Sequence, residues 1–213
     1  MPNWCENVLY IKHNDPEQIK RLANAAENGR ILDEFVPCPK ELHITAGTSS
    51  NPIEQRKIEL QEKFNQEKYG YKNWYDFQTA EWGTKWDVHT CDITDQDENS
   101  ITIVFQSAWS PPVSGISTMC QENGFTAKLF YHEGGEAFCG KYDSESGEDE
   151  YFNLSNLEST DELENVIPRD ILDEFNLVEF YAEIFNENEP DEYEDDDRDK
   201  PDESSSANTA PSI

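Results

Sequence analysis

The acidic residues of this 213-residue chain are gathered toward its C-terminus, and this uneven charge limits how much of the chain can pack into one body. The whole chain has a net charge of −30, yet residues 1–90 hold 11 basic and 14 acidic groups. Residues 143–213 hold 3 basic and 25 acidic groups, a net charge of −22. We therefore expect a mildly acidic folded body at 1–142, followed by a separate acidic region.

The acidic region divides into two parts of different composition. Residues 186–213 are rich in Pro, Ser and carboxylates and nearly free of apolar residues, which is typical of a disordered tail. Residues 143–185 form an acidic extension with an amphipathic helix at 168–185, where apolar residues recur every three or four positions. The apolar stripe of this helix needs a surface to cover it, either on the body or on a partner protein.

Strand-like and helix-like segments alternate in the body. Residues 31–42 are expected to be extended, because the prolines in Pro37-Cys38-Pro39 disfavour helix, and a helical insert occupies about 46–82. The strands are expected at 7–13, 87–93, 101–107, 125–132 and 137–142, and the other helices at 16–26 and 111–123. This order predicts an α+β fold in which helices back an antiparallel sheet.

Four segments of the body carry distinctive aromatic and proline motifs. They are MPNWCENVLYI, FVPCPKEL, YGYKNWYDFQTAEWGTKWDV, and AWSPP with the hairpin that ends in FCGKY. Together they resemble the YubB-like proteins of plasmids and phages, a family of unknown function. The resemblance covers residues 1–142 and implies a ferredoxin-like domain and a mobile-element origin, but it implies no activity and no catalytic residues.

Motifs for the common catalytic, cofactor and metal sites are missing from the sequence. There is no P-loop, G-x-G-x-x-G, G-x-S-x-G or H-E-x-x-H motif. His89 and Cys91 lack the spacing of a zinc site, and the acidic segment that starts at Asp95 lacks the glycine and glutamate of an EF-hand loop. We expect a non-enzymatic protein with no cofactor and no bound metal.

An aromatic–lysine cluster is the strongest local feature of the body. Seven aromatic residues and two lysines lie within the 18 positions from Tyr69 to Trp86, and a third lysine, Lys68, directly precedes them. Aromatic rings interleaved with lysines stack on bases and contact phosphates in single-stranded nucleic acid, but the same rings can instead close the core of a small α+β domain. The candidate binding surface consists of Trp82, Lys85, Trp86 and Trp109.

The acidic region offers a second candidate surface. Its carboxylates oppose direct binding to nucleic acid or anionic lipid, whereas they attract the basic groove of a nucleic-acid-binding protein. The candidate residues for such a partner are Asp170, Asp173, Glu174, Glu179, Glu183, Asp195, Asp196 and Asp197.

Two functions from different classes follow from these surfaces. The leading hypothesis is a non-enzymatic acidic interaction protein of a phage or plasmid. It would bind a basic host or phage protein, with nucleic-acid mimicry in counter-defence as one form of that role. The alternative is a binder of single-stranded nucleic acid or nucleotides that uses the aromatic–lysine cluster.

The cysteines and the chain start bear on the compartment. Five scattered cysteines without a C-x-x-C pair favour reduced thiols over a disulfide framework. We find no leader-like segment and no apolar run long enough to span a membrane. We expect a cytoplasmic protein with no membrane partner.

Overall fold

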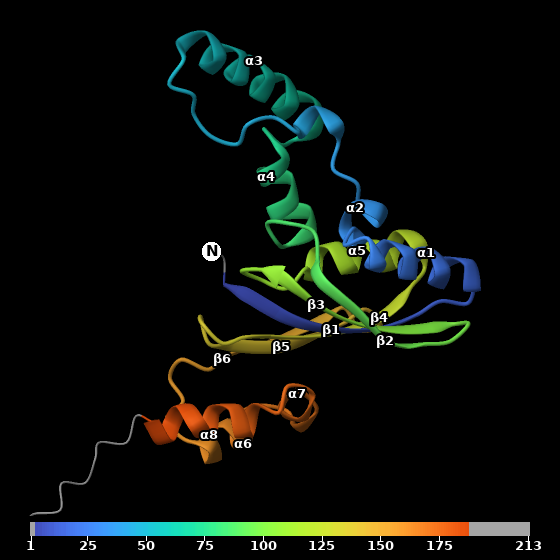
Figure 1. Cartoon of the computed structure of the whole chain (residues 1–213), viewed down its shortest axis with the longest axis vertical. Coiled ribbons are helices and arrows are strands. Elements are labelled where there is room, and N and C mark those ends of the chain that lie inside the picture. The colour runs from blue at the N-terminus through green and yellow to red at the C-terminus, as the bar shows by residue number, and fades with distance from the viewer. Residues whose placement is uncertain (1–2, 188–213) are drawn as a thin grey trace, which may run out of the picture.

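A computed structural model describes residues 3–187 of the chain. In these residues six strands form one antiparallel sheet at the centre of the molecule (Figure 1). The strands lie in the order β2-β3-β1-β4-β5-β6. Their bounds are β1 Trp4–Lys12, β2 His89–Gln96, β3 Ser100–Ala108, β4 Thr126–Glu133, β5 Phe138–Asp143 and β6 Glu148–Asn153. The tail beyond residue 187, with Asp195, Asp196 and Asp197, lies outside the described residues.

The first four strands and two helices have ferredoxin-like connectivity. The chain forms α1 (Pro16–Glu27) after β1 and α5 (Val113–Asn123) between β3 and β4. Both helices cover the same face of the sheet. The order β-α-β-β-α-β with strands β2-β3-β1-β4 side by side is the split βαβ arrangement. The predicted fold class, an α+β ferredoxin-like sheet backed by helices, is confirmed.

A first core lies between the sheet and α1 and α5. Alternate residues of β1 and β3, such as Leu9 and Ile103, point into it because side chains alternate across a strand. Leu22 of α1 and Ile116 of α5 pack against them in one continuous cluster. Asp15 fixes the start of α1, since its carboxylate accepts the backbone N–H of Glu17 at 3.0 Å.

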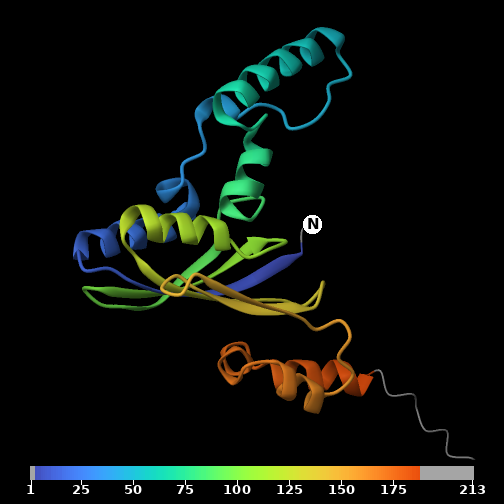
Figure 2. The ribbon, with the colours of Figure 1, turned by 180° about the vertical axis from the view of Figure 1, so that it is seen from behind.

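Helices occupy the insert between α1 and β2. They are α2 Ile31–Phe35, the 3₁₀ turn η1 Lys40–Leu42, α3 Pro52–Tyr69, α4 Trp74–Phe77 and the π-helical turn η2 Gln78–Trp82. The extended conformation that we expected for 31–42 is wrong at α2 and η1. Tertiary contacts explain α2, because the Asp87 carboxylate accepts the backbone N–H groups of Leu32 and Asp33 at 2.9 and 2.8 Å. Helix α3 stands away from the sheet (Figure 2).

The sheet continues past the end of the predicted body. The boundary that we placed at residue 142 falls inside β5, and β6 then pairs with β5 from Asp143↔Glu148 to Phe138↔Asn153. The predicted acidic extension therefore contributes an edge strand to the sheet. The sequence pattern concealed β6, because its residues, EDEYFN, are mostly exposed and do not show an apolar alternation.

Three further helices cover the opposite face of the sheet and form what we call the C-terminal layer: α6 Thr160–Val166, α7 Arg169–Glu174 and α8 Leu177–Glu187. The single helix expected at 168–185 is two helices, because Asn176 between them has a positive φ of 51°. Ile171 and Leu177 of these helices are fully buried against Phe130 of β4 and Cys139 of β5. The body thus covers most of the apolar stripe, whereas Phe180 and Ile184 stay exposed.

Two global properties concern the compartment. All five cysteines are free, and only Cys91 is less than fully buried. Between residues 3 and 187, no helix is long and apolar enough to span a bilayer.

Candidate functional site

Trp82 lies in the core and not on a binding surface. Its side chain is 2% exposed, and its indole N–H donates to the carbonyl of Val36 at 2.8 Å. The placement of Trp82 in the candidate surface is therefore wrong. Gly83 causes the separation, since its left-handed φ of 81° ends η2 and redirects the chain before Lys85 and Trp86.

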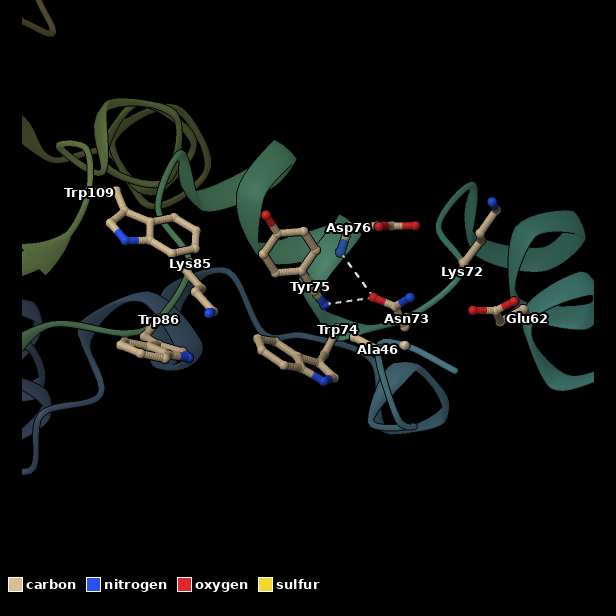
Figure 3. A pocket seen from close by; sticks show the side chains of 11 residues that line it. Ala46, Glu62, Lys72, Asn73, Trp74, Tyr75, Asp76, Lys85, Trp86 and Trp109 are labelled. Carbon is tan, nitrogen blue, oxygen red and sulfur yellow. Dashed lines mark hydrogen bonds between the residues drawn. The ribbon is translucent and has the colours of Figure 1, made fainter. Parts of the chain in front are cut away.

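Lys85, Trp86 and Trp109 do come together, at a pocket of about 670 Å³ (Figure 3). The other wall of this pocket is the start of α4, which contributes Trp74 and Tyr75. We call these five residues and the space between them the aromatic–lysine pocket. The remaining lining residues are Ala46, Gly47, Glu62, Lys72, Asn73 and Asp76.

The Lys85 ammonium is surrounded by aromatic rings. Its Nζ lies 4.6 Å from the ring centre of Trp86 and 4.5 Å from that of Trp109, with Tyr75 at 5.9 Å. These distances allow cation–π attraction. In the described part of the chain Lys85 forms no ion pair. What distinguishes Lys85 from the other lysines without an ion pair is that three aromatic rings lie around its ammonium.

Trp109 is held in an unusual backbone conformation. It is 43% exposed and has a φ of 72°, which is rare for a bulky residue. Its backbone N–H donates to the carbonyl of Asn3 at 3.0 Å. Ser110 Oγ donates to the Gly83 carbonyl at 2.6 Å, and Thr84 Oγ1 donates to the Ala108 carbonyl at 2.8 Å. These bonds tie the backbone around Trp109 to the segment that carries Lys85, so the backbone position of Trp109 is set in advance of any ligand.

The opposite wall is also positioned by hydrogen bonds. The Asn73 side chain caps α4 by accepting the N–H groups of Tyr75 and Asp76 at 3.0 and 3.2 Å. Fully buried Asn65 of α3 donates to the carbonyls of Glu41 and Lys72 at 3.0 and 2.9 Å. The pocket wall that the start of α4 forms is therefore anchored to α3 and η1.

Asp87 supports the segment before β2 that carries Lys85 and Trp86. Its carboxylate accepts backbone N–H groups from Leu32, Asp33 and Val88. Burial raises the pKa of Asp87 in spite of these donors. The contact connects α2 to the pocket.

Trp4 extends the aromatic surface beyond the candidate residues that the sequence predicts. It stacks on His89 at 5.0 Å between ring centres and lies 6.3 Å from Trp86. Spacing along the chain could not have predicted this contact, because the pairing of β1 with β3 and of β3 with β2 creates it.

The candidate carboxylates of the C-terminal layer have local partners. Asp170 pairs with Lys141 at 2.8 Å, and Asp173 pairs with Arg169 at 3.0 Å. Both oxygens of Glu174 accept from the Tyr10 hydroxyl, at 2.9 and 3.0 Å. Glu179 accepts from the Asn176 amide, and Glu183 is exposed. Contacts thus tie Asp170 and Glu174 to the body.

A second hollow lies beside Glu174, on the part of the sheet that the C-terminal layer leaves open. This sheet groove has a volume of about 580 Å³ and a partly apolar floor that includes Tyr10 and Val104. Three carboxylates line it, those of Glu6, Asp92 and Glu174. Lys, Arg and His are absent from its lining among the described residues.

Comparisons with known proteins match one family model and one solved structure. No curated protein matches the chain. The crystal structure of a protein api92 from Yersinia pseudotuberculosis aligns with 74% of this chain and 99% of that chain, at 10% identity and a TM-score of 0.39. Residues 85–168 match the family model described as a ferredoxin-like domain in Api92-like protein, a stretch that includes Lys85, Trp86 and Trp109 but not the insert with Trp74 and Tyr75.

Proposed function

We propose that this chain is a binding protein whose aromatic–lysine pocket takes a nucleotide unit, either free or within a single strand of nucleic acid. The observation that carries the proposal is Lys85, whose ammonium is held between two exposed tryptophans, Trp86 and Trp109. A base stacks on an indole ring, and the ammonium beside it contacts the phosphate.

The position of Lys85 favours this ligand over a cation. Aromatic cages bind quaternary ammonium groups through ring faces, but Lys85 already occupies the space between Trp86 and Trp109. A second positive charge there would be repelled. A ligand with a π face and a negative charge instead gains from both the rings and the ammonium.

The charge around the pocket limits how much nucleic acid can bind. Lys72 and Lys85 are balanced by Glu62 and Asp76 in the lining, and the rest of the chain is strongly acidic. A long duplex backbone would meet net repulsion. A volume of about 670 Å³ falls within the usual range of ligand sites, about 300–1,000 Å³, and suits one nucleotide unit.

Titration of tryptophan fluorescence with oligo(dT), oligo(A) and AMP tests the proposal. We expect saturable quenching, and we expect Trp109→Ala to weaken binding by about 5- to 150-fold, the equivalent of about 1–3 kcal/mol per stacked base. Lys85→Met should weaken binding and flatten its salt dependence. Tyr151→Ala is the control, because Tyr151 is 55% exposed but lies outside the pocket.

The outcomes of this titration distinguish a free nucleotide from a nucleotide unit within a single strand. Binding of AMP as tight as that of the oligonucleotides, per nucleotide, indicates a free nucleotide as ligand. Equal binding by wild type, Trp109→Ala and Lys85→Met would show that the pocket is not the site.

A second candidate function is the binding of a basic protein segment, as expected for an acidic interaction protein of a phage or plasmid. The sheet groove favours it, since Glu6, Asp92 and Glu174 line that groove without a cation among the described residues. Residues 143–187 hold 15 acidic groups and 1 basic group, and of these acidic groups Glu174 lines the groove. The resemblance to YubB-like proteins implies a mobile-element origin, and such an element would gain from counter-defence by nucleic-acid mimicry.

Calorimetric titration with a lysine- and arginine-rich peptide, at low and moderate salt, tests this second function. We expect the double variant Glu6→Gln with Asp92→Asn to weaken binding more than the surface variant Asp173→Asn. Equal effects of the two variants would reduce the interaction to net charge alone.

Both candidate functions are non-catalytic, and we propose no enzyme activity. We also propose a reducing compartment such as the cytoplasm, because all five cysteines are free and their burial raises thiol pKa values, that of Cys139 to about 12.

A further inference from the structure

Helix α3 carries a line of exposed apolar side chains. Ile53, Leu60 and Phe64 are 71%, 56% and 49% exposed. Spacings of seven and four residues place these side chains within roughly 40° of one another around the helix. Large apolar side chains that share one exposed face of a helix mark an association surface.

The opposite side of α3 already packs on its own molecule. Asn65 is fully buried there, and Tyr69 contacts the first core. Ile58, also half-buried, lies on that side as well. The helix is therefore docked in a fixed orientation, and the line formed by Ile53, Leu60 and Phe64 is left over after docking.

Charge indicates what covers this line. Helix α3 holds four acidic and four basic residues, a net charge of zero in a chain of net charge −30. The helix also stands at the opposite end of the molecule from the acidic C-terminal layer (Figures 1 and 2). Two copies of the chain repel each other over most of their surface, whereas a contact through α3 keeps the acidic layers far apart.

We propose that α3 pairs with α3 of a second copy of this chain in an antiparallel, two-fold symmetric contact. In such a contact each copy uses the same patch. Ile53 of each copy packs near Phe64 of the other, and Leu60 lies close to the symmetry axis. An antiparallel pair also directs the two bodies to opposite sides of the contact.

The size of the patch sets the strength of the pair. A single helix pair buries less than the roughly 1,200–2,000 Å² of a stable complex. The dimer is therefore weak and reversible, and its population rises with protein concentration. It is independent of the ligand proposed for the aromatic–lysine pocket.

Sedimentation equilibrium of the full chain over a concentration series tests the proposal. We expect the mean mass to rise from the monomer value of 24.6 kDa toward twice that value. Leu60→Ser and Phe64→Ser should each remain monomeric over the same range while keeping the wild-type circular dichroism. Val166→Ser is the matched control, because Val166 is 52% exposed on α6, and it should associate like the wild type.

Salt gives a second readout. Screening of the net charge of −30 should strengthen a contact through neutral α3. Three results would overturn the proposal: a wild type that stays monomeric throughout, Ser variants that associate like the wild type, or association that weakens as salt rises.

Discussion

The aromatic–lysine pocket and the C-terminal layer use similar residues in opposite ways. In the C-terminal layer the apolar side chains, such as Leu177 and Tyr181, face the sheet, and the carboxylates face the solvent. In the pocket, Trp86 and Trp109 remain 39% and 43% exposed around a half-buried lysine. The C-terminal layer stabilises the fold, because its apolar side chains are buried against the sheet. The exposed rings of the pocket add little to the stability of the fold, so a binding role explains them better.

The largest expected effect separates the two kinds of tryptophan. Trp82→Ala should lower the free energy of unfolding by about 3–5 kcal/mol, because it empties a fully buried site. Trp109→Ala should change it by only about 0.5 kcal/mol, since exposed side chains contribute little. Urea denaturation followed by circular dichroism measures both, and a large loss for Trp109→Ala would make that ring part of the core.

The next effect concerns the C-terminal layer. Ile171→Ala should lower the free energy of unfolding by about 2–5 kcal/mol, because Ile171 is fully buried between the C-terminal layer and the sheet. The matched control is Ile53→Ala in dilute solution, where the exposed Ile53 side chain should give a change near zero. Equal costs at the two positions would contradict a layer that is integral to the fold.

The same comparison shows what the sequence predicts well. Period-two and period-3.6 patterns placed five strands and the helices α1 and α5 close to their observed bounds, and they placed a helical insert at about 46–82, where α3, α4 and η2 lie. They missed α2, whose start depends on the distant carboxylate of Asp87, and β6, whose residues are too polar to show a buried face. Local patterns fail where a contact far along the chain decides the structure.

The candidate site was predicted in part for a similar reason. Lys85, Trp86 and Trp109 were singled out by residue type, and they do meet. Trp82 belongs to the same sequence motif, but the turn at Gly83 sends it into the core. Trp74 and Tyr75 join the pocket because α3 and η1 anchor their loop, which the spacing of aromatic residues does not reveal.

A smaller effect is expected from acid at the buried face of the C-terminal layer. Burial lowers the pKa of His132, which packs against Phe175, Phe180 and Tyr181. The unfolded chain therefore binds this proton more readily than the folded chain. Above a pH of about 6.5, the pKa of histidine in the unfolded chain, His132 is neutral in both states and the fold keeps its full stability. As the pH falls from that value toward the lowered pKa of the folded state, the unfolded chain binds the proton first and the fold loses stability.

Denaturation of wild type and His132→Phe from pH 7.5 down to 5 measures this effect. The difference in unfolding free energy between the two proteins should shift in favour of His132→Phe as the pH falls, because phenylalanine does not titrate. A constant difference over this range would show that His132 has the same pKa in both states.

The smallest expected effect is at the edge of the sheet groove, where Tyr10 meets the C-terminal layer. Burial and the hydrogen bond to Glu174 raise the pKa of Tyr10 to about 12. Glu174→Gln removes the negative charge but not the burial, so the pKa of Tyr10 should fall without reaching its ordinary value. A raised pKa means that this contact stabilises the fold below about pH 10, and that this stabilisation is lost as the pH rises through the pKa of the folded state.

Carbon-13 NMR of labelled tyrosine rings follows the titration of Tyr10. Asp173→Asn, a neighbouring change on α7 that leaves the Tyr10–Glu174 contact in place, should not move it. If Glu174→Gln left the pKa unchanged, burial alone would account for it, and Glu174 would be free to face a basic partner in the groove.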